Sequence, residues 1–172
     1  MARNLRKIVT FSSLYPNNVD PIHGIFVERR LLELRNSLEF RSTVIAPVPW
    51  FPSTAPIFGQ YAEFASVCDH ETRSGITVKH PRHISIPKIG MNIAPKLMAR
   101  ACMPVFQQLQ KEWGEISLID AHYAYPDGVA AAKIANALEV PLIITVRGSD
   151  INLIAEYRNP KRQIVRAADV AT

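Results

Sequence analysis

The alternation of short apolar segments with longer amphipathic segments constrains the fold of this chain more than any other feature of its sequence. Five short runs rich in β-branched and apolar residues are typical of strands: residues 7–11, 42–48, 75–80, 117–121 and 141–146. Helical periodicity marks residues 25–34, 92–113 and 129–138, and a loop and helix are expected over residues 148–166. Short strands separated by helices indicate a parallel sheet with right-handed crossovers. We therefore predict an α/β fold, a Rossmann-like parallel sheet flanked by helices.

Proline, glycine and asparagine residues set the expected ends of these elements. The proline-rich segment Pro47–Phe58 is expected to be a stiff loop. In the long helix, Asn92 is the expected N-cap, Pro104 should kink or split the helix, and Gly114 should end it. The run at 141–146 is the most obvious candidate for a buried strand. Residues 169–172 look like the start of a sixth strand, so the chain is expected to end inside that strand.

Composition limits the class of protein. A length of 172 residues suits one α/β domain, and 48% apolar with 20% charged residues is ordinary for a globular protein. The two cysteines, Cys68 and Cys102, lie far apart in no metal or redox spacing, which favours a reducing compartment. The sequence shows no secretory signal and no apolar run long enough to span a membrane. These features predict a cytoplasmic protein.

The charge of the chain is unevenly distributed. The net charge is +5, and no acidic residue occurs between Thr72 and Lys111. The basic and histidine residues of this stretch are Arg73, Lys79, His80, Arg82, His83, Lys88, Lys96, Arg100 and Lys111. A surface of one sign attracts phosphates, acidic glycans or an anionic membrane, although a solvated face without a ligand explains it equally well. Nucleic acid is not expected as a ligand, because aromatic residues are not interleaved with these basic residues.

Ligands of open parallel sheets bind at the carboxyl ends of the strands, so the segments after each strand are the candidate sites. Residues 12–24 follow the first strand, and Gly24 stands at the junction with the next helix. A glycine there lets backbone N–H groups approach a phosphate, although an ordinary turn also explains it. The chain has neither G-x-G-x-x-G nor G-K-[ST], so it lacks the dinucleotide fingerprint and the P-loop.

A second candidate segment, Asp120–Gly128, follows the fourth strand with the sequence Asp-Ala-His-Tyr-Ala-Tyr-Pro-Asp-Gly. His122, Tyr123 and Asp127 offer several hydrogen-bonding groups at a strand end, and Gly128 sets a sharp entry into the next helix. Such a group suits a hydroxyl-rich substrate. A purely structural role for His122 is the alternative.

A third candidate segment, Thr145–Asn152, follows the fifth strand. Arg147 is a natural clamp for an anion, and Asp150 and Asn152 can bind sugar hydroxyls. In the alternative interpretation, Ser149 or Asp150 caps the next helix and Arg147 is its ion partner.

A metal site is not predicted from these strand ends. Asp120, Asp127 and Asp150 lie on different loops without a ligand spacing, and no cluster of cysteines and histidines accompanies them. The nucleophile motif G-x-S-x-G is also missing.

Several of these segments resemble a known family. The resemblance rests on Phe11–Pro16, His23–Arg30, Val44–Pro49, Asp120–Gly128 and Thr145–Asn152. Together they are similar to the first half of family-four retaining glycosyltransferases of the GT-B fold, in particular those that build bacterial surface polysaccharides. The resemblance extends over almost the whole chain.

The resemblance implies two Rossmann-like domains that face a cleft. The N-terminal domain mainly binds the acceptor, the C-terminal domain holds the nucleotide-sugar co-substrate, and transfer retains the anomeric configuration without a metal or other cofactor. By position, Gly24 would lie near the donor phosphates and His122 would be the catalytic histidine. The expected acceptor-binding residues are His122, Tyr123, Asp127, Gly128, Arg147, Ser149 and Asp150. Many family members have histidine where this chain has Arg147, and an arginine there fits an anionic group instead.

The resemblance also implies that residues 1–172 are the acceptor-side domain and that the donor-binding domain is not in this sequence. Such a domain would transfer no sugar by itself and would be marginally stable. The acceptor would be a glycan or a lipid-linked glycan, with a possible peripheral contact to the anionic inner face of the membrane. Two alternatives remain open: a non-catalytic module that binds a glycan or nucleotide, and a different α/β enzyme of the flavodoxin-like or epimerase type.

Overall fold

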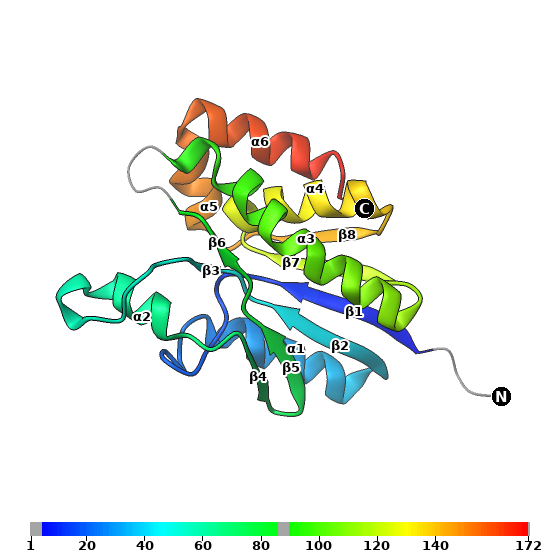
Figure 1. Cartoon of the computed structure of the whole chain (residues 1–172). Helices are drawn as coiled ribbons and strands as arrows, with labels where there is room; N and C mark the ends of the chain where they lie inside the picture. The colour runs from blue at the N-terminus through cyan, green and yellow to red at the C-terminus, as the bar shows by residue number, and fades with distance from the viewer. Residues whose placement is uncertain (1–4, 86–89, 172) are drawn as a thin grey trace.

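A six-stranded sheet forms the centre of the protein (Figure 1). The computed structural model describes residues 5–85 and 90–171. The strand order is β4-β5-β2-β1-β7-β8. The strands are β1 (Arg6–Phe11), β2 (Phe40–Ile45), β4 (His70–Arg73), β5 (Ile76–Lys79), β7 (Leu118–His122) and β8 (Leu142–Thr145). Every pair is parallel except β4 and β5, which form an antiparallel hairpin. The predicted α/β class and mostly parallel sheet are confirmed, and the antiparallel edge strand is an addition to the prediction.

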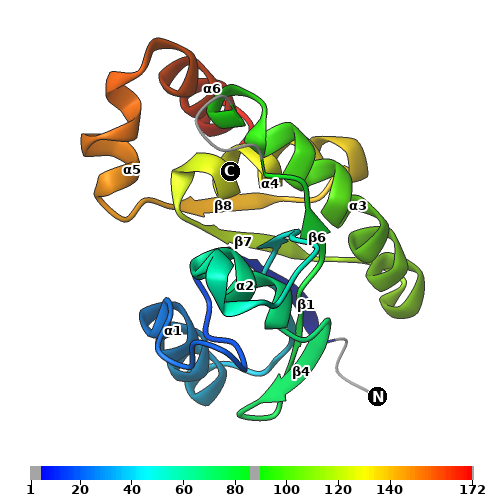
Figure 2. The same ribbon diagram turned by 60° about the vertical axis from the view of Figure 1, so that its left-hand side comes forward.

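Helices cover both faces of this sheet (Figures 1 and 2). They are α1 (Ile25–Ser37), α3 (Ala94–Trp113), α4 (Val129–Leu138) and α6 (Arg158–Ala168). Side chains of a strand alternate between the two faces, so neighbouring residues of β2 enter different cores. Val44 packs with Val27 and Leu31 of α1, whereas Ile45 packs with Met98 of α3 in the larger core that α4 and α6 complete.

The long helix α3 departs from its predicted boundaries. Asn92 is not the N-cap, because it lies in the short 3₁₀ turn η2 (Gly90–Asn92) and α3 begins after Ile93 without a side-chain cap. Pro104 does not split the helix. Buried residues on both sides of Pro104, Cys102 and Phe106, keep the apolar face of α3 on the sheet and offset the hydrogen bond lost at proline. Gly114 ends the helix with a φ of 81°, as predicted.

The last predicted strands also differ from expectation. The run expected to be the most buried, residues 141–146, forms the edge strand β8, where Ile143 is 41% exposed. The strand is apolar because α4 and η3 (Ala124–Gly128) cover one of its faces, and it is not buried on both faces. The expected sixth strand is not seen in residues 169–171, which leave α6 through a turn, and Thr172 lies outside the described residues.

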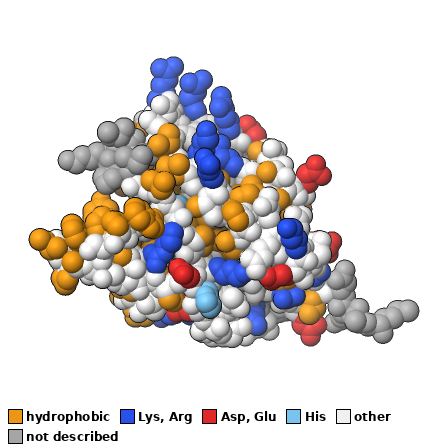
Figure 3. Space-filling model, viewed as in Figure 1, with side chains coloured by type: hydrophobic (Ala, Val, Ile, Leu, Met, Phe, Trp, Pro, Cys, Tyr) orange, Lys and Arg blue, Asp and Glu red, His pale blue; other side chains and the backbone are white. Residues whose placement is uncertain are grey.

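The proline-rich segment is more ordered than a loop. Val48–Pro49 forms β3, which pairs with β6 (Arg82–His83), and the chain then forms η1 (Pro56–Phe58) and α2 (Gln60–Ser66). Aromatic contacts stabilise the segment that contains η1 and α2, since the centroid of the Phe51 ring lies 5.2 Å from the centroids of the Phe58 and Tyr61 rings. Figure 3 shows hydrophobic side chains gathered at the end of the molecule where Figure 1 draws α2. In the part of the chain that the structure describes, no helix is long and apolar enough to cross a membrane.

Candidate functional site

His122 is the centre of a polar cluster at the carboxyl end of β7. It is the last residue of the strand and is 1% exposed. Its Nδ1 lies 2.8 Å from Nη2 of Arg147, and its Nε2 lies 3.3 Å from Oδ2 of Asp120 and 3.2 Å from Nη1 of Arg30. A guanidinium can only donate, so Nδ1 accepts from Arg147. In the neutral ring the proton is therefore on Nε2, where it faces the Asp120 carboxylate, and Nη1 of Arg30 donates to Asp120 rather than to the ring.

Asp120 carries the negative charge of this cluster. Its Oδ2 accepts a hydrogen bond from Nη1 of Arg30 at 2.6 Å. Burial alone would raise the pKa of Asp120, but His122 and Arg30 outweigh it and hold that pKa below its usual value. The other carboxylate oxygen, Oδ1, is buried and has no partner among the described residues. The cluster thus contains an acceptor that an additional donor could satisfy.

Arg147 joins His122 to the solvent-facing side of the cluster. Its guanidinium lies over the Phe26 ring, 4.7 Å from the ring centroid, and burial together with the nearby Arg30 lowers its pKa. Its Nε is buried and lacks a partner among residues 5–85 and 90–171. Arg30 and Arg147 therefore place two guanidinium groups around one strand end, an arrangement that suits a negatively charged group.

Asp150 is a buried carboxylate that holds the loop after β8. It is 0% exposed and accepts hydrogen bonds from the backbone N–H groups of Ala124, Arg147 and Ile151 at 2.5, 3.0 and 3.1 Å. The expected ion pair with the Arg147 side chain is not formed, because that guanidinium binds His122 instead. Helix α5 (Ser149–Asn152) begins after Gly148, and no side chain caps it in the usual way.

The partly buried Tyr123 and the exposed Ser149 connect these two loops. The Tyr123 hydroxyl lies 2.7 Å from Oγ of Ser149, so one hydrogen bond joins the loop after β7 to α5. Tyr123 has a φ of 82°, a left-handed conformation that costs a bulky residue free energy. Strained residues of this kind cluster at ligand sites, and both hydroxyls can reach a ligand in solvent.

Asp127 is also buried, and it joins two loops. It is 0% exposed and accepts hydrogen bonds from the backbone N–H and the hydroxyl of Ser13 at 3.0 and 2.9 Å. Burial raises the pKa of Asp127 to about 7 even though these hydrogen bonds oppose the change. Gly128 follows it in a tight position, since an added Cβ would lie 2.9 Å from Cγ2 of Ile144. Both residues fix the geometry of the strand end.

Gly24 is required by a close approach of two backbone segments. It has a φ of 61°, and an added Cβ would lie 2.2 Å from the carbonyl oxygen of Leu14. The loop after β1 therefore packs on the start of α1 at a point where a side chain has no space. This contact explains the glycine without a ligand, and its position near the donor phosphates stays a prediction.

Open space lies beside this polar cluster, over the carboxyl ends of β1, β3 and β6. We call it the α2 hollow, and its volume is about 350 Å³. Its polar lining consists of Ser13, Asn17, Asp20, His23, Gln60, Glu63, His83 and Ser85. Its apolar lining includes Phe64 and Val67 of the α2 region and Met98 of α3. None of the predicted acceptor-binding residues lines it. Ser13, Asn17, Asp20 and His23 belong to the candidate segment 12–24 after the first strand, whereas sequence reasoning missed the lining residues that come from α2 and α3.

A second hollow, of about 480 Å³, lies over the β4–β5 hairpin and α3, with His80, Arg82 and Gln108 in its lining. It is lined by none of the predicted site residues.

The predicted basic surface is divided by the fold. Arg73 donates to Oε1 of the buried Glu28 at 2.9 Å, and Arg82 donates to the carbonyl oxygens of Phe64 and Val67. The histidines of the stretch, His80 and His83, are buried. The exposed cations include Lys96, Arg100 and Lys111 on α3, and Lys88 lies outside the described residues. The prediction of a single basic surface over residues 73–111 is therefore wrong, because the pairing of the strands turns alternate side chains toward the interior.

Comparison with known proteins supplies one relationship. No family model matches this chain. The chain is 30% identical over 152 residues to a Bacillus subtilis (strain 168) protein described as "Putative teichuronic acid biosynthesis glycosyltransferase TuaC". The match covers 88% of this chain and 38% of that protein, so the chain spans well under half of its relative. The chain is thus distantly related to a part of a glycosyltransferase.

Proposed function

We propose that this chain is the acceptor-side, N-terminal domain of a family-four retaining glycosyltransferase of the GT-B fold. The observation that carries the proposal is the relationship to a teichuronic acid glycosyltransferase, which extends over 88% of the chain. In this proposal a further domain holds the nucleotide-sugar, and residues 1–172 present a glycan or lipid-linked acceptor to it. No metal or other cofactor takes part in the transfer itself, and the enzyme works in the cytoplasm on surface polysaccharide.

The α2 hollow is the proposed acceptor site. It opens at the carboxyl edge of the sheet, where open α/β sheets bind their ligands. Its lining combines apolar side chains such as Phe64 and Met98 with hydrogen-bonding groups such as Asn17 and Glu63. Sugar rings need both kinds of contact, because they have apolar faces and hydroxyl edges.

The cluster around His122 is the proposed site of a negative charge on the acceptor or donor. Arg30 and Arg147 flank it, and the unpaired Nε of Arg147 is available for a further hydrogen bond. A substrate phosphate or carboxylate matches this pair, and the relative's name refers to the biosynthesis of an acid, teichuronic acid. His122 itself is 1% exposed and both ring nitrogens face protein groups. We therefore propose that it acts as a positioning residue for Arg147 and Asp120, while direct catalysis by His122 stays a prediction from the sequence.

Sugar transfer by the natural gene product tests this proposal. The assay measures transfer from nucleotide-sugars to a lipid-linked glycan with wild-type protein, His122→Gln and, as a control, His70→Gln on the exposed edge strand β4. Misplacing Arg147 by about 1 Å should lower kcat about 100-fold in His122→Gln, and the control should keep the wild-type rate. Arg147→Lys should raise KM, since it removes the bidentate fork but keeps the charge.

Different results would contradict different parts of the proposal. A gene product that binds glycans but transfers no sugar from any nucleotide-sugar would favour the alternative, a non-catalytic binding module. Equal kcat in His122→Gln and wild type would remove the positioning role but leave the transferase assignment intact.

Peripheral membrane contact is a further part of the proposed function. Two exposed groups of side chains support it: the aromatic and aliphatic residues around α2, including Trp50, Ile57 and Tyr61, and the cations of α3. Sedimentation with phosphatidylglycerol vesicles should exceed sedimentation with phosphatidylcholine vesicles. Equal binding to both would contradict an electrostatic contribution.

A further inference from the structure

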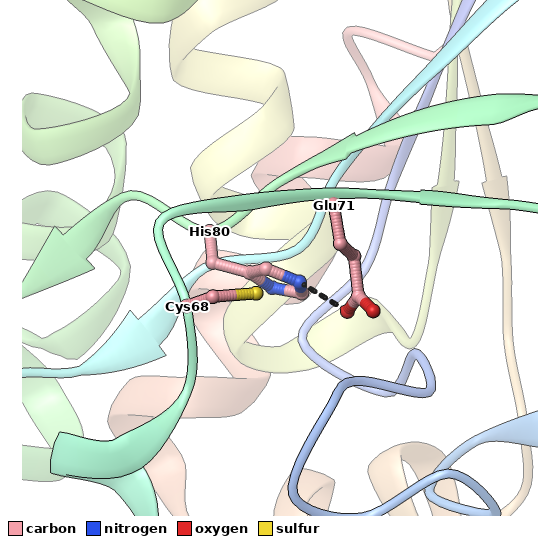
Figure 4. A group of neighbouring side chains, drawn as sticks. All are labelled: Cys68, Glu71 and His80. Carbon is pink, nitrogen blue, oxygen red and sulfur yellow. Dashed lines mark hydrogen bonds and ion pairs between the residues drawn. The ribbon is translucent and has the colours of Figure 1, made fainter.

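Three side chains with metal-binding atoms meet beside the C-terminus of α2 (Figure 4). Cys68 follows α2, Glu71 lies on β4, and His80 follows β5. The sulfur, one carboxylate oxygen and one imidazole nitrogen all lie within 4.8 Å of one another. This group was not predicted from the sequence, because the spacing of residues 68, 71 and 80 matches no common motif. The β4–β5 hairpin creates it by pairing the residues around Asp69 with those around His80.

The hydrogen bonds of His80 fix the orientation of its ring. Its Nδ1 lies 3.1 Å from the carbonyl oxygen of Ala46, and a carbonyl can only accept, so Nδ1 carries a proton. Its Nε2 lies 3.0 Å from Oε1 of Glu71. A neutral ring would point its lone pair at a carboxylate, so a positive species belongs between these two atoms.

We propose that Cys68, Glu71 and His80 bind a divalent transition metal, with Zn²⁺ as the best match. Imidazole, thiolate and carboxylate are the usual ligands of Zn²⁺, at about 2.0–2.3 Å from the ion. Such ligand atoms lie about 3–4 Å apart in a tetrahedral site, so the ion requires only a small closing movement of Cys68. The Nδ1–H of His80 donates to a backbone carbonyl, which is the outer-shell hydrogen bond typical of a zinc-bound histidine.

Charge and access agree with this assignment. The thiolate and the carboxylate together balance the two charges of Zn²⁺, and the thiol proton leaves to solvent when the metal binds. The second carboxylate oxygen of Glu71 lies 3.8 Å from Nη1 of Arg73, which leaves Oε1 for the metal. Cys68 and Glu71 are only partly buried, so an ion can reach them from solvent, and solvent can supply the fourth ligand.

The site would fix one wall of the α2 hollow. Two other groups already hold the same chain segment: Asn18 accepts from the backbone N–H of Cys68 at 2.8 Å, and Arg82 donates to the carbonyl oxygens of Phe64 and Val67. A metal bound to Cys68 would tie the end of α2 to the β4–β5 hairpin. We infer a structural clip rather than a chemical centre, and this inference stands independently of the proposed glycosyltransferase activity.

Metal titration of the full chain tests the inference. Chelator-treated protein is titrated with Zn²⁺ in competition with a metal indicator and, separately, with Co²⁺ in an absorption experiment. We expect one Zn²⁺ per chain with a Kd on the order of 1 µM or tighter. Co²⁺ should give the intense near-ultraviolet band of a cobalt–thiolate bond. Cys68→Ser should abolish that band and weaken Zn²⁺ binding more than about 100-fold, because even outer-shell changes cost 10–100-fold.

Two further variants make the result decisive. His70→Gln changes an exposed histidine on the same hairpin and should bind Zn²⁺ like the wild type, whereas His80→Gln should not. Circular dichroism confirms that each variant is folded, and alkylation of Cys68 by iodoacetamide should slow when Zn²⁺ is present. A wild-type protein without the cobalt–thiolate band, or Cys68→Ser with wild-type Zn²⁺ affinity, would overturn the inference.

Discussion

The loops after β7 and β8 and the α2 hollow lie at the same edge of the sheet, but they are built differently. The loops carry the polar motifs of the sequence, yet Asp127 and Asp150 are 0% exposed and bind backbone N–H groups. The hollow has few conspicuous residues, yet it has about 350 Å³ of open space. The difference teaches that a polar motif at a strand end can serve mainly to stabilise the loops. Such a motif then affects ligand binding indirectly, through the position of those loops.

This comparison separates two kinds of substitution. Changes at the buried carboxylates of the loops should act mainly on the stability of the fold. Changes in the lining of the hollow should act on ligand binding and leave stability nearly unchanged. Tyr123, which is partly buried, and Ser149, which is exposed, should fall between the two classes.

Asp150→Ala should give the largest loss of stability. It leaves the N–H groups of Ala124 and Arg147 without their acceptor, and each buried unpaired group costs about 1–3 kcal/mol. The N–H of Ile151 keeps the carbonyl oxygen of Gly148 as its acceptor. We expect the free energy of unfolding to fall by about 4–5 kcal/mol, measured by urea denaturation. Asp150→Asn keeps one acceptor oxygen and should lose clearly less. A loss below about 1 kcal/mol for the alanine variant would contradict a structural role.

The buried carboxyl of Asp127 should make stability depend on pH. Its pKa is raised to about 7 in the folded protein, above the value of about 4 of an unfolded carboxyl group. Between these values the folded state holds a proton that the unfolded state has released, so stability should fall as pH rises from about 4 to about 7. The expected fall is on the order of 3 kcal/mol in urea denaturation at each pH.

Asp127→Asn is the matched variant for this measurement. It keeps an acceptor for the N–H of Ser13 and removes the titrating group, so its stability should be flat over the same window. Asp120 has a lowered pKa, and its contribution is lost only as pH falls below the range of an unfolded carboxyl group, outside this window. Equal slopes in Asp127→Asn and wild type would assign the pH dependence to another group.

The sequence predicted the central strands and the helices on the sheet, because their apolar residues repeat with a clear period. The bounds of α4, Val129–Leu138, agree with the prediction, and most of its residues are apolar and buried. The strand β4 was missed because His-Glu-Thr-Arg has no apolar pattern and pairs only through its contact with β5. Helix α2 was missed because the prolines before it suggested a loop.

The candidate site was predicted only in part, for a related reason. Residue type and position after a strand predicted both His122 and Arg147 as binding residues, and Nδ1 of His122 lies 2.8 Å from Nη2 of Arg147, while their role in binding stays a prediction. The same information could not tell that Asp127 would turn inward to Ser13, because that depends on the path of a distant loop. The α2 hollow and the Cys68–Glu71–His80 group also depend on long-range pairing, which leaves no short motif in the sequence.

Gln60→Trp should impair ligand binding without changing stability. Gln60 is an exposed residue of α2 in the lining of the hollow, so an indole ring there would occupy part of the space. In the natural gene product we expect KM for the acceptor to rise about tenfold, equivalent to about 1.4 kcal/mol. The free energy of unfolding should stay within about 0.5 kcal/mol of wild type. Gln107→Trp, on the exposed side of α3, is the control, and an equal rise in KM there would argue against the hollow as the acceptor site.

Tyr123→Phe should have the smallest effect on stability and shows whether the two regions act together. It removes only the hydrogen bond to Ser149, which is exposed, so the free energy of unfolding should fall by about 0.5 kcal/mol. Ser149→Ala removes the same bond from the other side and should give the same loss. If the hydroxyls also bind the acceptor, each variant should raise KM several-fold while kcat stays unchanged, because uniform binding is lost. Unchanged KM in both variants would confine acceptor binding to the hollow and leave the loops after β7 and β8 a supporting role only.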